Sequence, residues 1–98
     1  MEERLNELKP VFTDILPKGD ELEFGKIYIS RDKGNARLLC PCGCGTVSDI
    51  PFTEGHFTLR CWRLNISSNR IMFHPDLLEK KCPNKAHYYI TFNKIQWL

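Results

Sequence analysis

The sequence predicts a small, mainly β domain with antiparallel strands, and a small α+β arrangement is the alternative. Short stretches of alternating apolar and polar residues are separated by turn-forming residues about every ten positions, which is typical of all-β domains. The chain has 98 residues, so residues 1–98 are expected to form a single domain. Its hydrophobic fraction of 42% and charged fraction of 27% indicate a globular protein with a modest core.

The N-terminal residues predict a short helical turn or a flexible arm over residues 1–9. Leu5 and Leu8 stand among charged residues at the spacing of one helical face. Pro10 is expected to end this helix, because the residue before a proline is pushed out of the α region. Residues 11–16 are then predicted to form a short strand.

The middle of the chain predicts strands joined by tight turns. Alternation is clearest where Ile27 and Ile29 share one face and Tyr28 takes the other. Turn signals occur at residues 32–35 and 67–69. The predicted strands of this region are residues 26–30, 36–39, 47–52, 57–66 and 71–73.

The C-terminal part predicts one helical turn followed by a hairpin. Residues 74–81 contain a proline and an adjacent pair of leucines, which favours a single helical turn. Residues 87–92 and 94–97 alternate as strands do, and they are expected to form a hairpin across Asn93.

The chain contains five cysteines, and their context favours a metal site over disulfides. Residues 1–4 are acidic and lack an apolar segment, so no signal peptide is expected. No run approaches the roughly 20 apolar residues that span a bilayer. A cytoplasmic location without a membrane partner is therefore expected, and there cysteines more often serve metal binding or catalysis.

Two segments supply the candidate metal ligands. Cys40, Cys42 and Cys44 lie in the run Cys-Pro-Cys-Gly-Cys-Gly, whose glycines permit a turn that aims several sulfurs at one point. Cys82 and His87 follow as a C-x4-H pair. Zn²⁺ prefers four thiolate or imidazole ligands in a tetrahedron. The sequence therefore predicts a compact, zinc-ribbon-like β domain organised around one structural zinc ion per chain.

Five candidate ligands compete for four positions. Cys44, Cys82 and His87 are assigned first, and Cys40 and Cys42 compete for the last position unless a binuclear site uses all five. Thiolates also accept iron, but the spacing resembles no ferredoxin pattern, which favours zinc. The sequence lacks the H-E-x-x-H and H-x-E…P-C-x-x-C motifs of catalytic zinc sites. No catalytic residue is assigned, and no enzyme activity is expected.

The remaining thiol and imidazoles are expected to have structural roles. Cys61 stands beside Trp62 in a predicted strand, where a free cysteine usually packs as a small apolar residue. His56 follows a glycine in a predicted loop, and His74 precedes a proline. Both histidines are expected to be structural or exposed.

The motifs resemble a bacterial and phage domain family without an assigned activity. Its pattern reads G-x-L-Y-V-S, C-P-C-G-C-G, W-x-L, P-S-I, C-x-S-H-Y-x-I and G-x-V-x-W. The matching positions lie between Pro10 and Trp97 and comprise Gly25–Ser30, Ala36–Gly45, Trp62, Pro75, Cys82, His87–Ile90 and Trp97. The resemblance implies zinc binding at the five candidate ligands. It also implies genes beside those for ubiquitin-like activating, conjugating and JAB-peptidase-like proteins, and hence a role in a ubiquitin-like or antiphage-defence pathway.

Three positions depart from the pattern of the resembling family. Many members have a histidine two residues before the first cysteine, where this chain has Leu38. The usual C-x-x-H is here C-x4-H, which makes that loop two residues longer. The serine of P-S-I is replaced by Asp76, which weakens any role assigned to a hydroxyl at this position.

The first functional hypothesis is an interaction or adaptor module with a protein partner. Aromatic residues are candidates for its surface, although filling a small core is favoured for them: Phe52, Phe57, Tyr88 and Trp97. The second hypothesis is a nucleic-acid-binding zinc module, although a net charge of +2 is weak for that role. Its candidate contacts are Arg60, Arg63, Lys80, Lys81 and Lys85. The third is an enzyme with a reactive thiol or an open zinc site. The sequence leaves the oligomeric state open.

Overall fold

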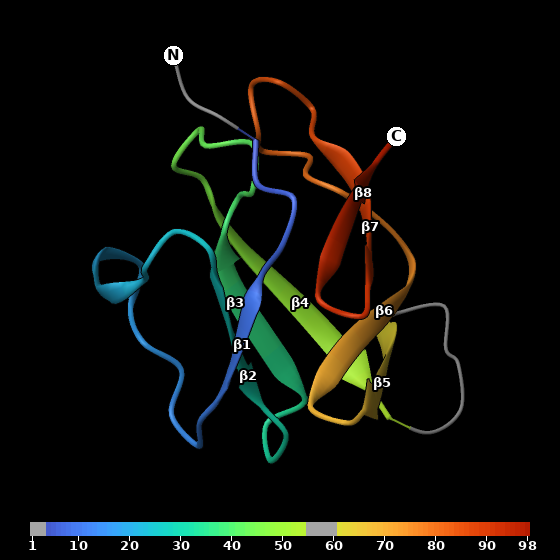
Figure 1. Ribbon diagram of the computed structural model, residues 1–98. Coiled ribbons are helices and arrows are strands. Elements are labelled where there is room, and N and C mark those ends of the chain that lie inside the picture. The colour runs from blue at the N-terminus through green and yellow to red at the C-terminus, as the bar shows by residue number, and fades with distance from the viewer. Residues whose placement is uncertain (1–3, 55–60) are drawn as a thin grey trace.

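A computed structural model describes residues 4–54 and 61–98 and confirms a mainly β fold. Eight strands follow one another in chain order within one curled sheet (Figure 1). They are β1 (Lys9–Phe12), β2 (Lys26–Ser30), β3 (Asn35–Leu39), β4 (Val47–Thr53), β5 (Trp62–Ser67), β6 (Arg70–Leu78), β7 (His87–Thr91) and β8 (Lys94–Trp97). A short 3-10 helix, η1, spans Gly19–Glu21.

The sheet consists of two groups of strands that meet at a short seam. Neighbouring strands are antiparallel except for the β1–β2 and β4–β5 pairs, which are parallel. The β4–β5 pairing joins only Phe52 with Trp62 and Thr53 with Arg63. In Figure 1, β4 reaches from the β1–β3 group to the β5–β8 group. Because this backbone seam is short, side-chain packing is needed beside it to hold the two groups together.

The N-terminal residues close the curled sheet against β8. The Leu8 N–H donates to the Asn93 carbonyl at 2.7 Å, and the Ile95 N–H donates to the Asn6 carbonyl at 2.8 Å. Residues 4–8 therefore lie along β8 and form no helix, so the predicted helical turn over residues 1–9 is wrong for its described part. Their backbone groups are used by a strand from the other end of the chain.

Three further element predictions differ from the observed strands. The strand predicted at residues 11–16 is β1, which begins two residues earlier and ends at Phe12. The helical turn predicted at residues 74–81 is wrong, because β6 continues through Leu78. This strand has hydrogen-bonded neighbours on both sides, and Leu77 points into the core while Leu78 is exposed. The strand predicted at residues 57–66 begins at Trp62, and residues 57–60 lie outside the described residues.

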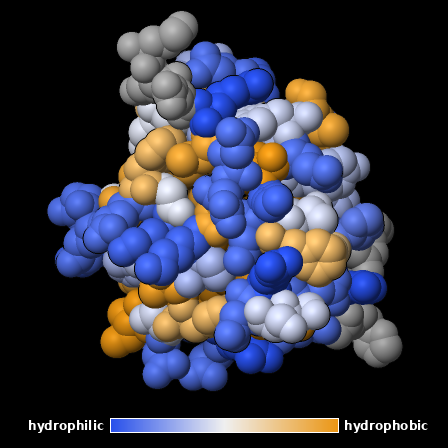
Figure 2. Space-filling view, viewed as in Figure 1, coloured by the Kyte–Doolittle hydropathy of each residue, from blue (hydrophilic) through white to orange (hydrophobic). Residues whose placement is uncertain are grey.

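The core fills the inside of the curled sheet. Tyr88 is fully buried at its centre, and Phe52 is 7% exposed, which confirms that these aromatics fill the core. Trp97 is partly buried against the same cluster, whereas Phe57 lies outside the described residues. On the face in Figure 2, hydrophobic residues form several separate spots among hydrophilic ones. No helix in the described residues is long and apolar enough to cross a membrane.

The predicted hairpin of β7 and β8 is confirmed, and its turn depends on Asn93. Phe92 and Asn93 both have positive φ, at 48° and 68°. The Asn93 side-chain oxygen accepts a hydrogen bond from the Ile71 N–H at 2.8 Å, and the Asn93 N–H donates to the Ile71 carbonyl at 3.0 Å. Asparagine suits this place, because it tolerates left-handed backbone angles and carries an acceptor.

Replacing Asn93 with alanine is expected to lower the free energy of unfolding by about 2 kcal/mol. Alanine leaves the Ile71 N–H without its side-chain acceptor, at about 1–3 kcal/mol, and it tolerates the left-handed angles poorly. Asn93→Gly is the matched control, since it removes the acceptor but accepts the backbone angles. Urea unfolding should rank the proteins wild type, Asn93→Gly, Asn93→Ala. An alanine variant as stable as wild type would contradict this account of the turn.

Candidate metal centre

The first cysteine loop connects β3 to β4 and is closed by its own backbone. The Cys40 N–H donates to the Thr46 carbonyl at 2.8 Å, and the Gly43 N–H donates to the Cys40 carbonyl at 3.1 Å. Gly43 and Gly45 have φ of 91° and 86°, angles that residues with a Cβ rarely adopt. The glycines therefore allow the chain to reverse while its three cysteines face one point, as predicted.

The second cysteine loop connects β6 to β7 and presents Cys82. The Glu79 N–H donates to the Ala86 carbonyl at 2.8 Å, which joins the two ends of the loop. Inside it, the Cys82 N–H donates to the Glu79 carbonyl at 3.1 Å, and the Lys85 N–H donates to the Cys82 carbonyl at 3.0 Å. Both cysteine loops lie at the same end of the molecule (Figure 1).

The sulfurs of Cys40, Cys42, Cys44 and Cys82 converge, all within 4.8 Å of one another. The Cys40–Cys42 sulfur distance is 3.5 Å, and Cys82 Sγ lies 3.4 Å from the sulfurs of both Cys42 and Cys44. A tetrahedron with Zn–S bonds of about 2.3 Å has edges of roughly 3.8 Å. Three of the four cysteines are buried and Cys44 is half-buried. The group could therefore hold a metal ion with little rearrangement.

The loops also supply polar groups around the sulfurs. The Asn84 backbone N–H donates to Cys82 Sγ at 3.3 Å, and its side-chain amide donates to Cys42 Sγ at 3.6 Å. Cys44 Sγ lies 3.2 Å from the Thr46 hydroxyl. Donors such as those of Asn84 stabilise and orient metal-bound thiolates.

Burial and hydrogen bonding move the thiol pKa values in opposite directions. Burial raises the pKa of Cys40 and also that of Cys42. Burial acts in the same direction on Cys44, but hydrogen bonds with the Thr46 side chain and backbone, Cys82 and Cys42 outweigh it and lower its pKa to about 7. Cys44 is thus the thiol most readily ionised among these three, which suits a first contact with a cation.

The other predicted site residues lie elsewhere in the described structure. His87, the fifth candidate ligand, is outside the group of four sulfurs, and its Nε2 contacts the Asp76 carboxylate. Cys61 is half-buried at the start of β5 and is also outside the group. His74 is exposed on β6, as expected, and His56 lies outside the described residues.

The Asp76–His87 pair is a half-buried site on the outer face of β6 and β7. Both side chains are a little more than one-third exposed, at 38% and 39%. The hydrogen bond with His87 lowers the pKa of Asp76, which favours its ionised form. The Trp62 indole N–H donates to the Asp76 carbonyl at 3.1 Å and fixes the backbone there.

Two exposed leucines flank this pair. Leu78 is opposite His87 in the β6–β7 register, and the Leu98 N–H donates to the His87 carbonyl at 2.9 Å. Opposite residues in an antiparallel pair point to the same side of the sheet, and both leucines are about half exposed or more, at 48% and 60%. Sequence reasoning missed this site. Its signal in the sequence was Asp76, which stands where the family pattern has a serine, together with a histidine later in the chain.

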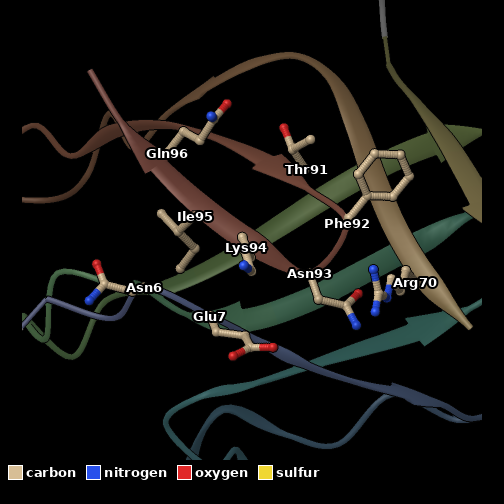
Figure 3. Close-up of a pocket in the computed structure, with 9 residues that line it drawn as sticks. All are labelled: Asn6, Glu7, Arg70, Thr91, Phe92, Asn93, Lys94, Ile95 and Gln96. Carbon is tan, nitrogen blue, oxygen red and sulfur yellow. The ribbon is translucent and has the colours of Figure 1, made fainter.

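A separate pocket of about 520 Å³ lies between the N-terminal segment and the β7–β8 hairpin (Figure 3). Glu7, Arg70 and Lys94 line it together with the exposed ring of Phe92. No cysteine or histidine is among the described residues that line it. The pocket is therefore distinct from both the sulfur cluster and the Asp76–His87 pair, and its charges are mixed.

The basic residues named for nucleic-acid binding lie in two parts of the chain. Lys80, Lys81 and Lys85 belong to the second cysteine loop, where the Lys85 ammonium donates to the Lys80 carbonyl at 3.1 Å. Arg63 lies on β5, and Arg60 is outside the described residues. Nucleic-acid binding stays a prediction.

Residues 12–98 match the family described as "Bacterial ubiquitination-like system serine protease (BubE)". The chain belongs to this family. The match to BubE includes both cysteine loops and the Asp76–His87 pair, and it confirms the predicted link to a bacterial ubiquitin-like system. No curated protein and no solved structure matches the chain.

Proposed function

We propose that this chain is a zinc-stabilised BubE-family domain that binds a protein partner of the ubiquitination-like system without cleaving it. Family membership supports the system and a polypeptide partner. The convergent cysteines support the metal. The absence of cleavage rests on one observation, which is the identity of the side chain beside His87.

A serine protease needs a serine hydroxyl within hydrogen-bond reach of a general base, usually a histidine. Here the group that contacts His87 Nε2 is the carboxylate of Asp76. Position 76 is also where the family pattern has the serine of P-S-I. A carboxylate can orient an imidazole, but it lacks the hydroxyl from which a serine protease forms its acyl-enzyme ester. Among the described residues, His87 therefore has a carboxylate beside it in place of a serine nucleophile.

The four serines of the chain are positioned elsewhere. Ser30 is fully buried and donates to the Asp14 carbonyl, and Ser48 is buried and donates to the Glu79 carboxylate. Ser67 and Ser68 lie at the β5–β6 turn, at the opposite end of β6 from Asp76. Strand geometry separates them from Asp76 by about 20 Å. None of the four can serve His87 in this arrangement.

The metal in this proposal is zinc, one ion per chain, held by the four cysteines. A set of four thiolates fills the tetrahedron and leaves no place for a catalytic water, which is typical of structural sites. The proposal therefore leaves His87 to the outer-face site, where it faces a partner rather than the ion. The surface around the Asp76–His87 pair combines two exposed leucines with a polar pair. This composition is typical of a protein–protein contact and not of a phosphate-binding surface.

Replacing Asp76 with serine is expected to create a reactive serine in a chain that otherwise has none. A serine hydroxyl at this position would point from β6 toward His87, as the Asp76 carboxylate does, and a nucleophile–base pair requires a distance of roughly 2.6–3.2 Å. Incubation with a fluorophosphonate probe, followed by intact-mass spectrometry, should show one adduct on Asp76→Ser and none on wild type. Wild type should also co-elute with the system's ubiquitin-like protein and leave it intact.

Two controls make this experiment decisive. Asp76→Ala removes the carboxylate without adding a hydroxyl, so it should not react. The double variant Asp76→Ser with His87→Ala keeps the hydroxyl but removes the base, so its labelling should fall to background. A stoichiometric adduct on one of the wild-type serines would overturn the proposal and make the chain an active serine hydrolase.

A further inference from the structure

Glu79 is a buried acid, 8% exposed, at the end of β6. Its carboxylate accepts hydrogen bonds from the Ser48 hydroxyl at 2.8 Å and the Tyr88 hydroxyl at 2.6 Å. Its backbone carbonyl accepts from the Cys82 N–H and its backbone N–H donates to Ala86. One residue thus bonds to β4, β7 and both halves of the second cysteine loop.

A buried carboxylate is costly unless its hydrogen bonds are satisfied, so its presence calls for an explanation. The two partners of the Glu79 carboxylate follow the two cysteine loops closely. Ser48 lies on β4, just after the first loop, and Tyr88 lies on β7, just after the second. Their hydrogen bonds to one carboxylate fix the spacing between the two strands that leave the cysteine cluster.

The same residue also connects to the outer-face site. Tyr88 is fully buried and points inward, so its neighbour His87 points outward toward Asp76. The Glu79–Ala86 hydrogen bond sets where the chain enters β7, immediately before His87. Any shift of Glu79 would therefore move Cys82 on one side and His87 on the other.

We propose that Glu79 is a positioning residue that couples the metal centre to the Asp76–His87 site. The roles of the two sites come from the proposed function, so this proposal rests on it. The coupling between the sites is argued from the hydrogen bonds of Glu79. With the ion bound, Cys82 is held against the first cysteine loop, and Glu79 passes this restraint to the start of β7.

The test compares Glu79→Gln with Glu54→Gln, a matched change of an acid that pairs with Arg31 away from the cysteines. Glutamine preserves size and one acceptor but weakens the two hydrogen bonds from hydroxyls. Zinc affinity, measured by competition with a chromogenic chelator, should fall about 10- to 100-fold in Glu79→Gln, as for other groups that orient metal ligands. It should be unchanged in Glu54→Gln.

The second readout is the imidazole NMR signal of His87 in the zinc-loaded proteins, assigned by its loss in His87→Ala. In Glu79→Gln this signal should move toward its position in Asp76→Ala, which lacks the side chain that pairs with His87. If Glu79→Gln does not fold, Ser48→Ala removes one hydrogen bond and takes its place, with the same two shifts expected. Wild-type zinc affinity, or an unmoved His87 signal, would overturn the coupling.

Neither measurement uses a partner or a probe of reactivity. A negative result here would leave Glu79 as a buried structural acid and would leave the labelling pattern of Asp76→Ser unaffected. Conversely, a labelled wild-type serine would overturn the absence of cleavage without changing zinc affinity or the His87 signal. The two proposals therefore fail separately.

Discussion

Replacing Cys82 with serine is expected to abolish tight zinc binding and to unfold most of the protein at room temperature. Cys82 Sγ is fully buried and lies 3.4 Å from two other sulfurs, so it is the only ligand that the second loop contributes to the described cluster. Structural zinc contributes about 10–16 kcal/mol in zinc-finger peptides. Whole domains are stable by only about 5–15 kcal/mol. The contribution of zinc is therefore as large as the total stability of a domain, so loss of this ligand is expected to unfold the chain.

Cys61→Ser is the matched control for Cys82→Ser. Cys61 is a half-buried cysteine that lies outside the sulfur cluster. Elemental analysis should find one zinc per chain in wild type and in Cys61→Ser, and far less in Cys82→Ser. Circular dichroism during a chelator titration of wild type should show that the folded signal is lost as zinc is removed. Full zinc content in Cys82→Ser, or a wild-type fold indifferent to chelator, would refute the metal assignment.

Much of the metal centre could be predicted because cysteine spacing within tight loops is a local property. Three sulfurs separated by single residues, with glycines between them, can face one point whatever the rest of the fold does. The direction of His87 is not local in this sense. It is the first residue of β7, and whether it points toward the sulfurs or outward depends on Tyr88, which takes the inward place. The C-x4-H spacing alone does not contain that information.

The contact between Asp76 and His87 could not be predicted for a related reason. The β6–β7 register shifts between Phe73 and Leu77, and this irregularity places Asp76 next to the start of β7. A register shift between two strands leaves no periodic trace in either strand. The departure at position 76 could be noted from the sequence, but its neighbour required the structure.

Strands were predicted correctly where apolar and polar residues alternate regularly. Prediction failed where a segment pairs with a strand that is distant in the sequence. Lys26–Ser30 and Lys94–Trp97 alternate cleanly and were predicted with the observed bounds. The N-terminal residues were predicted as a helical turn because their two leucines fit that spacing. Their actual partner is β8, and the bridge between Glu7 and Lys94 joins nearly the two ends of the chain. Such a contact is invisible to any local pattern.

Replacing Phe73 with alanine is expected to lower the free energy of unfolding of the zinc-loaded protein by about 3–5 kcal/mol. Phe73 is 1% exposed and packs edge to face on Phe52, with ring centroids 6.0 Å apart. These rings belong to β6 and β4, and backbone pairing between β4 and β5 covers only two residue pairs. The ring contact therefore holds the two groups of strands together where hydrogen bonds are few.

Leu78→Ala is the control for Phe73→Ala, since it truncates an exposed side chain of the same strand and should change stability by less than about 0.5 kcal/mol. Urea unfolding at saturating zinc measures both variants while keeping the contribution of the metal constant. A loss below about 1 kcal/mol for Phe73→Ala would mean that the seam does not depend on this packing. Because Phe73 is not one of the four clustered residues, zinc content should remain at one per chain, which separates failure of the core from failure of the metal centre.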